Sequence, residues 1–373
     1  MARTPAPQEA DAPPEADRLE GFPHPRETAA LFGHAAAERG LAQAFAGGQM
    51  HHAWLLSGRR GIGKATLAYR LARHALAEPS ERDASGTTLK VAPDTRAARQ
   101  VNALSHPGLL LLRRPYDTRA KRYAQSIPID EVRRLKSFLG LTSAGGAWRV
   151  VLIDSADELN INAANAVLKS LEEPPARTMF LLISAAPSQL LATIRSRCRR
   201  LDLDALTGEP LRAAVTAALQ ARHMDPPDAE AWGELERVAQ GSVRRALQLV
   251  AAGGLALHAR IERLVGSLPR LDWQLAHALS DEMGYGAPEQ PYETFFELFL
   301  DQLARLVRAR ATGQGAPAER HLAERLIAPE RLPAWAEFWT TAVAEKADAG
   351  ELNLDRKATL TSLFARLEAL ARA

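Results

Sequence analysis

Between about residues 21 and 205, the apolar positions fall into short continuous runs separated by stretches of helical periodicity. Five runs have the length of buried strands, namely Ala53–Ser57, Leu109–Leu112, Arg149–Ile153, Met179–Ile183 and Arg200–Leu203. The stretches between them predict helices, over Lys64–Ala77, Asp130–Leu139 and Glu158–Leu171. Because all-apolar strands alternating with helices are typical of a parallel sheet covered on both faces, we predict an α/β domain at 21–205.

The strand signal stops after Leu203. Residues 206–266 show helical patterns, for example at Pro210–Arg222 and Ser242–Val250. From 267 to 373 the pattern is that of amphipathic helices throughout. Residues 1–20 are polar, acidic and rich in proline and alanine, which predicts a disordered tail. The chain therefore divides into a tail, an α/β domain, a small helical domain and a C-terminal helical domain.

Two stretches inside the α/β region carry no clear pattern. Residues 79–105 are polar and mixed, and Arg113–Arg122 is strongly basic. Both are predicted to be exposed loops. For the basic stretch, a solvated loop is the simpler interpretation, and contact with DNA phosphate or a partner subunit is the other.

Length and composition limit the possible functions. The 373 residues are too many for one compact core. The 47 basic residues nearly balance the 44 acidic ones, for a formal charge of +3, which argues against strong DNA binding by this chain alone. The single cysteine, Cys198, excludes an intramolecular disulfide and a four-cysteine zinc module, and we expect it to be a packing residue. No secretory signal and no apolar run of about 20 residues is present, so we expect a cytoplasmic protein.

A glycine-rich stretch, Gly58–Ala65, follows the first strand and opens a helix. Its Gly58, Gly61, Gly63 and Lys64 match the G-x-x-x-x-G-K core of a phosphate-binding P-loop. In such a loop the backbone N–H groups and the helix N-terminus face phosphate oxygens, and the lysine reaches the outer phosphates. The sequence therefore predicts a nucleotide site of P-loop type.

The next position departs from that motif. A P-loop ends in Ser or Thr, whose hydroxyl binds Mg²⁺, and here Ala65 stands in that place. Thr66 follows, but one residue along a helix turns a side chain by about 100°. Nucleotide binding can survive this loss because the backbone and Lys64 supply most of the phosphate contacts, whereas efficient hydrolysis is not expected.

A second departure follows the strand that ends at Ile153. Asp154 is placed either to act on Mg²⁺ or to hold the P-loop as a structural carboxylate. The next residue is Ser155, where hydrolysing AAA+ proteins have a glutamate that activates water, and a hydroxyl is a poor base at neutral pH. Asp157 and Glu158 are predicted to cap the following helix. The two departures together predict a site that does not hydrolyse ATP, and they leave open whether ATP, ADP or Mg²⁺ binds there.

Three further segments carry a resemblance to a known family. The segment Ser155–Pro175 (SADELNINAANAVLKSLEEPP) resembles the stretch after the second nucleotide motif of bacterial clamp-loader subunits, which are AAA+ proteins. Ser196-Arg197-Cys198 is similar to their Ser-Arg-Cys motif. Gly241–Leu247 (GSVRRAL) is similar to their second-sensor helix. The likeness is clear over residues 22–250 and weaker beyond.

This resemblance implies roles for single residues. Arg197, next to Ser196, is implied to be an arginine finger that reaches ATP bound by a neighbouring subunit. Ser184 takes the place of the first sensor, and Arg244 that of the second. The resemblance also implies a lid domain at 206–266 and a collar-type oligomerisation domain at 267–373. The implied partners are motor (gamma/tau-type) and delta-type subunits of DNA polymerase III, with primed DNA inside the assembly.

Within that family, the motor subunits have Ser or Thr after the P-loop lysine, a glutamate after the aspartate and four zinc cysteines. This chain has none of these. The delta-type subunit lacks the arginine of the Ser-Arg-Cys motif, which is present here. The chain therefore resembles the subunit type that donates an arginine without hydrolysing ATP, although it also lacks the zinc cysteines found in some of those proteins.

Two other functions compete with this interpretation. In one, the chain is an active AAA+ ATPase in which Thr66 and either Asp157 or Glu158 replace the missing groups. In the other, it is a DNA-recognition protein acting alone, which the nearly neutral charge disfavours.

Overall fold

The computed structural model describes residues 15–28, 30–83, 85–119, 122–140, 147–251, 253–284, 289–351 and 354–373. The chain divides into two compact units, the first ending at Leu247 and the second beginning at Gln248. This boundary falls inside the predicted lid domain, 206–266, so the division into lid and C-terminal domains stays a prediction.

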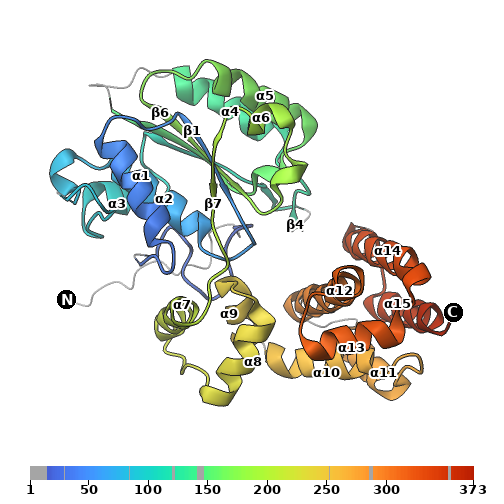
Figure 1. Cartoon of the computed structure of the whole chain (residues 1–373). Coiled ribbons are helices and arrows are strands. Elements are labelled where there is room, and N and C mark those ends of the chain that lie inside the picture. Colours follow the sequence, from blue (N-terminus) through green and yellow to red (C-terminus); the bar gives the residue numbers. More distant parts are fainter. Residues whose placement is uncertain are drawn as a thin grey trace, which may run out of the picture. The chain divides into compact units, whose positions relative to one another are not determined.

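A five-stranded parallel sheet with the order β2-β5-β6-β1-β7 forms the centre of the first unit (Figure 1). Its strands are β1 (Ala53–Ser57), β2 (Leu109–Leu112), β5 (Arg149–Ile153), β6 (Thr178–Ser184) and β7 (Arg199–Asp202). All five strands predicted from the sequence are confirmed to within one residue at each end. The parallel α/β fold is therefore confirmed as well.

Helices cover both faces of the sheet (Figure 1). One face carries α1 (Ala35–Ala46), α2 (Lys64–Leu76) and α3 (Arg96–Asn102), and the other carries α4 (Ile129–Gly140), α5 (Ile161–Glu172) and α6 (Ala192–Arg195). Side chains alternate between the faces, so Leu56 joins the first core and Leu55 the second. Because both faces are buried, every position of β1 and β6 is buried, which explains the continuous apolar runs.

The structure corrects two loop predictions. Residues 79–105 contain α3, which begins after Thr95, whose hydroxyl oxygen accepts a hydrogen bond from the Ala98 N–H. The basic stretch Arg113–Arg122 contains the short antiparallel pair β3 (Tyr116–Asp117) and β4 (Arg122–Tyr123), while residues 120–121 lie outside the described residues. These elements are too short to leave a periodic pattern in the sequence.

The helix predicted over Glu158–Leu171 begins later than expected. Ala156–Glu158 form a separate 3₁₀ turn, and α5 begins after Asn160, whose side chain accepts a hydrogen bond from the Ala163 N–H. The prediction that Asp157 and Glu158 cap this helix is therefore wrong, because Asn160 supplies the capping oxygen.

Helices α7 (Glu209–Gln220) and α8 (Ala229–Ala239) follow the sheet, and α9 (Val243–Ala251) crosses the boundary between the units. The predictions at Pro210–Arg222 and Ser242–Val250 agree with α7 and α9 to within two residues.

The second unit is helical in all its described elements, as predicted for residues 267–373. These are α10 (Gly254–Gly266), α11 (Trp273–Glu282), α12 (Glu289–Thr312), α13 (Pro317–Leu326), α14 (Leu332–Glu351) and α15 (Arg356–Arg372). Stacked Phe295 and Phe299 of α12 lie with ring centroids 5.5 Å apart, and Phe364 of α15 meets both edge-on.

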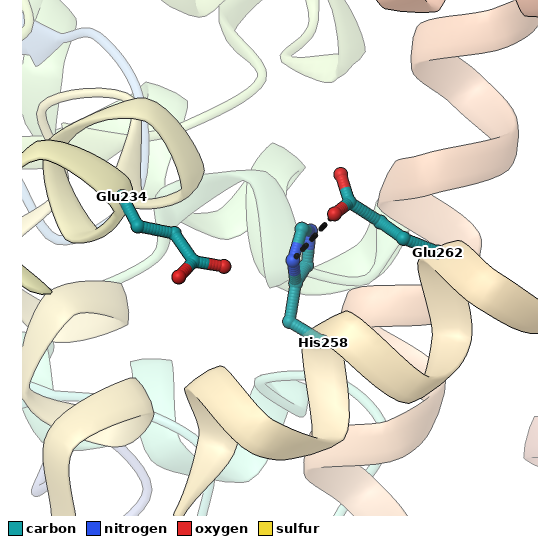
Figure 2. A group of neighbouring side chains, drawn as sticks. All are labelled: Glu234, His258 and Glu262. Atoms are coloured by element: carbon teal, nitrogen blue, oxygen red, sulfur yellow. Dashed lines mark ion pairs between the residues drawn. The ribbon is translucent and has the colours of Figure 1, made fainter.

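A polar cluster also lies within this second unit. On α10, His258 Nδ1 lies 3.7 Å from Glu262 Oε2, one turn further along the helix (Figure 2). The buried Arg305 of α12 forms an ion pair with Glu319 at 2.9 Å and one with Asp301. Burial of this guanidinium is tolerated because carboxylates accompany it.

None of the helices in the described part of the chain combines the length and apolarity that a membrane crossing requires.

A matched pair of isoleucines tests the sheet core. Ile153 of β5 is fully buried, whereas Ile161 of α5 is 59% exposed. We expect Ile153→Ala to lower the free energy of unfolding by about 2–5 kcal/mol, because it leaves a cavity in a close-packed core. Ile161→Ala should change it by no more than about 0.5 kcal/mol. Urea unfolding of the two variants measures both values, and equal losses would contradict the two-faced packing.

Candidate functional site

The glycine-rich loop joins β1 to α2 in a backbone conformation that its glycines require. Gly58, Gly61 and Gly63 have φ angles of 142°, 78° and 108°, which side chains rarely adopt. A Cβ at Gly58 would lie 2.4 Å from the Leu203 carbonyl oxygen. The predicted P-loop backbone is therefore present.

The loop is also docked on the start of α9. The N–H groups of Val243 and Arg244 donate to the Gly61 carbonyl oxygen over 2.9 and 3.3 Å. A Cβ at Gly61 would lie 2.4 Å from Ser242 Oγ. These contacts bring Arg244, the residue predicted as second sensor, to the loop although it lies far along the chain.

Lys64 is folded back onto its own loop. Its Nζ donates to the carbonyl oxygens of Gly58 and Arg59 over 2.7 and 2.6 Å. Burial lowers the pKa of Lys64 to about 8, against the raising effect of the Asp154 and Asp157 carboxyl groups. The lysine predicted to hold the outer phosphates therefore donates its hydrogen bonds to carbonyl oxygens of the same loop.

A cavity of about 520 Å³ lies beside this loop. Of the residues predicted for a nucleotide site, Lys64, Thr66, Asp154 and Arg244 line it, as do Gly61 and Gly63. Ala65 lines it too, so a methyl group stands where a P-loop presents its hydroxyl. Much of the remaining wall is apolar, including Leu19, Phe22, Leu31, Ala217 and Leu247. The volume is in the range of small-molecule sites.

Asp154 follows β5 and is buried at the cavity wall. Burial, together with the charge and hydrogen bond of Asp17, raises the pKa of its carboxyl group to about 8, although the nearby Lys64 lowers it. Its Oδ2 has no hydrogen-bond partner among the described residues. A neutral, protonated carboxyl group at neutral pH is a poor ligand for Mg²⁺.

The residues after Asp154 are engaged elsewhere. Ser155 has a left-handed backbone, with φ 57°. Asp157 accepts a hydrogen bond from the Ala185 N–H over 3.1 Å, and Glu158 forms an ion pair with Arg114 at 2.7 Å. Both acidic side chains thus tie neighbouring loops to this end of the sheet.

Ser184 ends β6 beside β1, where Ser57 is its partner in register. It is fully buried, and its Oγ accepts a hydrogen bond from the Ala186 N–H over 3.2 Å. The cavity is lined by its neighbours Ile183 and Ala185, and Ser184 is absent from the described lining. The predicted first sensor therefore closes a turn in this structure.

Ser196 and Arg197 do not belong to the cavity lining in the described part of the chain. They follow α6, just before the edge strand β7. The Arg197 side chain is 36% exposed, and its guanidinium pairs with Glu172 at 2.7 Å and donates to the Thr193 carbonyl oxygen over 3.0 Å. Ser196 Oγ also donates to that carbonyl, over 3.2 Å. The structure thus separates these two residues from the chain's own nucleotide motifs.

Cys198 is half-buried and packs against the core between the sheet and α4, α5 and α6. Burial raises the pKa of its thiol to about 12. The thiol therefore stays protonated and unreactive at neutral pH, as expected for a packing residue.

Sequence reasoning missed the contribution of the N-terminal residues. The segment 15–20, placed in the predicted disordered tail, makes ion pairs and lines the cavity through Asp17 and Leu19. The described part of the tail therefore differs from the prediction, and residues 1–14 lie outside the described residues. The one signal available was the density of charged residues between Glu15 and Glu27.

These groups do not fit a magnesium-bound triphosphate as they are arranged. Lys64 and Arg244 both donate to backbone carbonyls, with Arg244 bonded to Asp17 and Arg18. The Asp17 carboxylate stands beside Asp154 where further negative charge would be repelled. Ala65 also lacks the hydroxyl that a P-loop offers to Mg²⁺.

Comparison with known proteins places the chain among replication proteins. Residues 33–207 match the family described as DNA polymerase III, delta subunit. The chain is 34% identical to the DNA polymerase III subunit delta' of Pseudomonas aeruginosa over 71% of this chain and 74% of that protein. It is 32% identical to the delta' subunit of Escherichia coli over 65% of this chain and 68% of that protein. The tau subunit of Salmonella typhimurium is 34% identical over 56% of this chain, but over only 30% of its own length.

The buried carboxyl group of Asp154 makes stability depend on pH. Its pKa is raised from 3.8 to about 8 by burial and by Asp17, so the folded chain retains a proton that the unfolded chain has lost. This contribution is fully present below about pH 4 and is lost as pH rises toward 8. In Asp154→Asn the amide replaces the protonated carboxyl group and cannot ionise.

We therefore expect the melting temperature of Asp154→Asn, relative to the unsubstituted chain, to increase between about pH 5 and 8 and to level off above. Thermal unfolding across this range measures it. Asp225→Asn, at an exposed position, is the control and should give a difference that does not vary with pH. A flat difference for Asp154→Asn would mean that this carboxyl group is ionised throughout.

Proposed function

Since this chain belongs to the delta-prime family of DNA polymerase III clamp-loader subunits, we propose that it is the AAA+ subunit that donates Arg197 to ATP bound by a neighbouring subunit. It does not hydrolyse ATP itself. Its assembly partners are motor subunits of the gamma/tau type and a delta-type subunit. The complex loads the sliding clamp on primed DNA during replication, in the cytoplasm.

The location of Arg197 is the observation that carries this proposal. The guanidinium lies at the surface after α6, outside the chain's own cavity as described, and 36% of the side chain is exposed. A side chain placed in this way cannot serve the phosphate loop after β1, but a partner that covers α6 can meet it. The flanking Ser196 and Cys198 complete the Ser-Arg-Cys motif.

The guanidinium is suited to this role by its chemistry. During phosphoryl transfer negative charge is spread over the oxygens of the γ-phosphate, and a fixed planar cation beside them offsets it. Arginine presents two parallel N–H donors that match two phosphate oxygens, which a lysine ammonium does not. An arginine supplied by a neighbour is worth on the order of 10³-fold or more in rate.

The contacts of Arg197 within the chain favour its release. The pair with Glu172 is open to solvent on both sides, with the glutamate 48% exposed. Such exposed ion pairs contribute about 0–1 kcal/mol. The pair therefore keeps the guanidinium extended near the surface, and a phosphate with more negative charge can displace Glu172 at little cost.

The residues of the chain's own P-loop site support the proposal that this subunit does not hydrolyse ATP. Ala65 lacks the hydroxyl for Mg²⁺, Ser155 cannot activate water, and Asp157 and Glu158 are bonded to Ala185 and Arg114. The alternative, an active ATPase that uses Thr66, is favoured only by the presence of that hydroxyl-bearing residue in the cavity wall.

Substitution of Arg197 tests the role in trans. We expect Arg197→Ala to slow hydrolysis at the facing site on the order of 10³-fold, and Arg197→Lys to fail as well, because neither offers the planar pair of donors. DNA-stimulated ATPase of the reassembled complex measures this. Arg195→Ala, two residues away and exposed, is the matched control. A complex carrying Arg197→Ala with an unchanged rate rules the role out.

Hydrolysis by the isolated chain tests the idle site. We expect no release of labelled phosphate from ATP above the buffer rate, because both the metal ligand and the activating base are missing. If the chain turns over ATP and Lys64→Ala abolishes that turnover, the active-ATPase alternative holds instead.

A further inference from the structure

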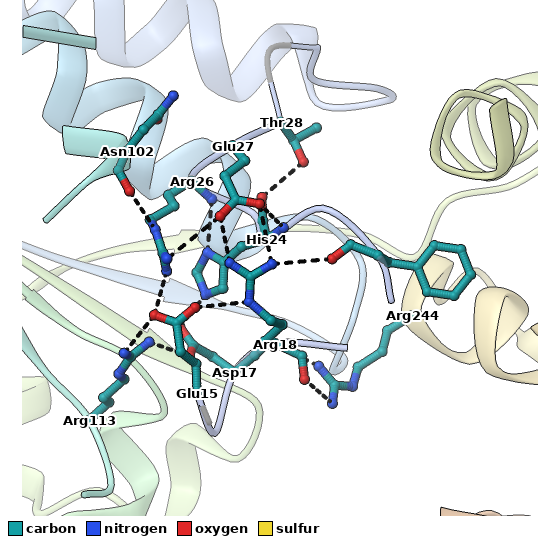
Figure 3. A network of polar contacts seen from close by, with 11 residues as sticks. Glu15, Asp17, Arg18, His24, Arg26, Glu27, Thr28, Asn102, Arg113 and Arg244 are labelled. Carbon is teal, nitrogen blue, oxygen red and sulfur yellow. Dashed lines mark hydrogen bonds and ion pairs between the residues drawn. The ribbon is translucent and has the colours of Figure 1, made fainter. Parts of the chain in front are cut away.

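The N-terminal segment, defined here as residues 15–28, forms part of the cavity wall, and Figure 3 shows the polar contacts that hold it. Asp17, Leu19, Phe22 and Pro23 contribute to the lining. The segment therefore forms part of the wall of the cavity in which a nucleotide at the P-loop would lie. This feature is separate from the role proposed for Arg197.

Two fixed donors hold the carboxylate of Asp17. Arg113 Nη1 donates to its Oδ1 over 2.7 Å. His24 Nε2 lies 2.7 Å from its Oδ2, and His24 Nδ1 accepts a hydrogen bond from the Arg26 N–H over 3.1 Å (Figure 3). Because Nδ1 is an acceptor, Nε2 carries the proton and donates it to Asp17. His24 is itself fully buried, so water does not compete for its hydrogen bonds.

Glu15 fastens the start of the same segment. Its carboxylate pairs with Arg26 at 2.8 Å, Arg113 at 2.7 Å and Arg18 at 2.9 Å. Burial alone raises the pKa of Glu15, but the hydrogen bonds from these three arginines lower it to about 2. Arg113, the first residue of the basic stretch, is thus used inside the chain and is not a free contact for DNA.

The apolar part of the segment is packed as well. Phe22 is buried, and the Arg222 guanidinium lies 4.9 Å above the centre of its ring. The segment is therefore anchored by side chains on both sides of Asp17, as expected of a built structural element.

The backbone of this segment also engages the sensor arginine. Arg244 Nη1 donates to the Asp17 carbonyl oxygen over 3.0 Å and Nη2 to the Arg18 carbonyl oxygen over 3.4 Å (Figure 3). Lys64 is bonded to the carbonyls of Gly58 and Arg59. Both cations that a P-loop protein uses on phosphates thus already have oxygen partners within the chain.

The negative charge of Asp17 also disfavours a polyphosphate in the cavity. The Asp17 carboxylate lies against the carboxyl group of Asp154 at the cavity wall. A polyphosphate entering beside it would bring like charges together in a partly buried space, where they are poorly screened.

We propose that residues 15–28 are an internal occupant of the nucleotide cavity, and that Asp17 is the residue that excludes a nucleotide's polyphosphate from the P-loop. The segment supplies the carbonyl oxygens that hold Arg244 and the carboxylate that repels phosphate. The N-terminal segment then disfavours ATP binding independently of the two defects in the hydrolytic motifs.

Fluorescent mant-ATP titrated into the isolated full-length chain tests this proposal, with Mg²⁺ and with EDTA in its place. The variant Asp17→Asn removes the charge and keeps the shape. We expect it to bind mant-ATP at least about ten-fold more tightly than the unsubstituted chain in both conditions. Glu20→Gln, an exposed carboxylate of the same segment, is the control and should leave the affinity unchanged. Adding Lys64→Ala to Asp17→Asn should remove the gain, which locates the nucleotide at the P-loop.

Asp17→Ala is the second variant, and it decides the question if the asparagine form fails to fold, as monitored by circular dichroism. The proposal is overturned if a folded Asp17 variant binds no more tightly than the unsubstituted chain, or if Glu20→Gln gives the same gain. It is also overturned if the gain survives Lys64→Ala. Tighter binding by the unsubstituted chain than by Asp17→Asn in Mg²⁺ alone would make Asp17 a metal ligand and also end the proposal. None of these outcomes depends on Arg197, because no neighbouring subunit is present.

Discussion

Burial of the Asp154 carboxyl group at the end of β5 is the constraint around which the cavity is organised. A charged carboxylate is expensive to bury without a partner, and the nearest cation, Lys64, is bonded to the carbonyl oxygens of its own loop. The carboxyl group is stable there because it keeps its proton, with a pKa raised to about 8, and shares a hydrogen bond with Asp17. Of the two carboxyl groups, Asp17 is therefore the one that is ionised. Its negative charge is stabilised by hydrogen bonds from Arg113 and His24.

Polar groups at the two ends of the α/β unit differ in whether they are already bonded within the chain or lie exposed at its surface. At the carboxyl ends of β1 and β5, the groups of a nucleotide site are present but satisfy one another. Beyond α6, next to the edge strand β7, Arg197 remains at the surface, held by a solvent-exposed ion pair with Glu172 and by a hydrogen bond to the Thr193 carbonyl oxygen. A phosphate site needs donors that can change partners, and the Arg197 guanidinium can do so at low cost because its ion pair with Glu172 is exposed to solvent. A division of labour between subunits follows from that asymmetry.

The fold was largely readable because its signals are local. Continuous apolar runs such as Arg149–Ile153 identify strands buried on both faces, and the glycines of Gly58–Lys64 identify a loop with left-handed backbone angles. Shorter elements were missed: α3 has seven residues, too few for a periodic pattern, and lies inside a stretch predicted as a loop. The roles given to Asp157 and Glu158 failed for a related reason, because an acidic residue near a helix start caps it only if the helix begins at the next residue, and α5 begins after Asn160.

By itself, the sequence determined which chemical groups are present: a phosphate loop without its hydroxyl, an aspartate followed by serine, and a Ser-Arg-Cys motif of the clamp-loader type. It also determined the order of strands and helices along the chain. Only the tertiary structure decided which of these groups meet. Asp17 and Arg244 are far apart in the chain, and their contact depends on α9 docking against the Gly61 carbonyl oxygen. Residue patterns record the environment of each position, buried or exposed, but they do not record the identity of a distant neighbour, and the state of a buried charge depends on that neighbour.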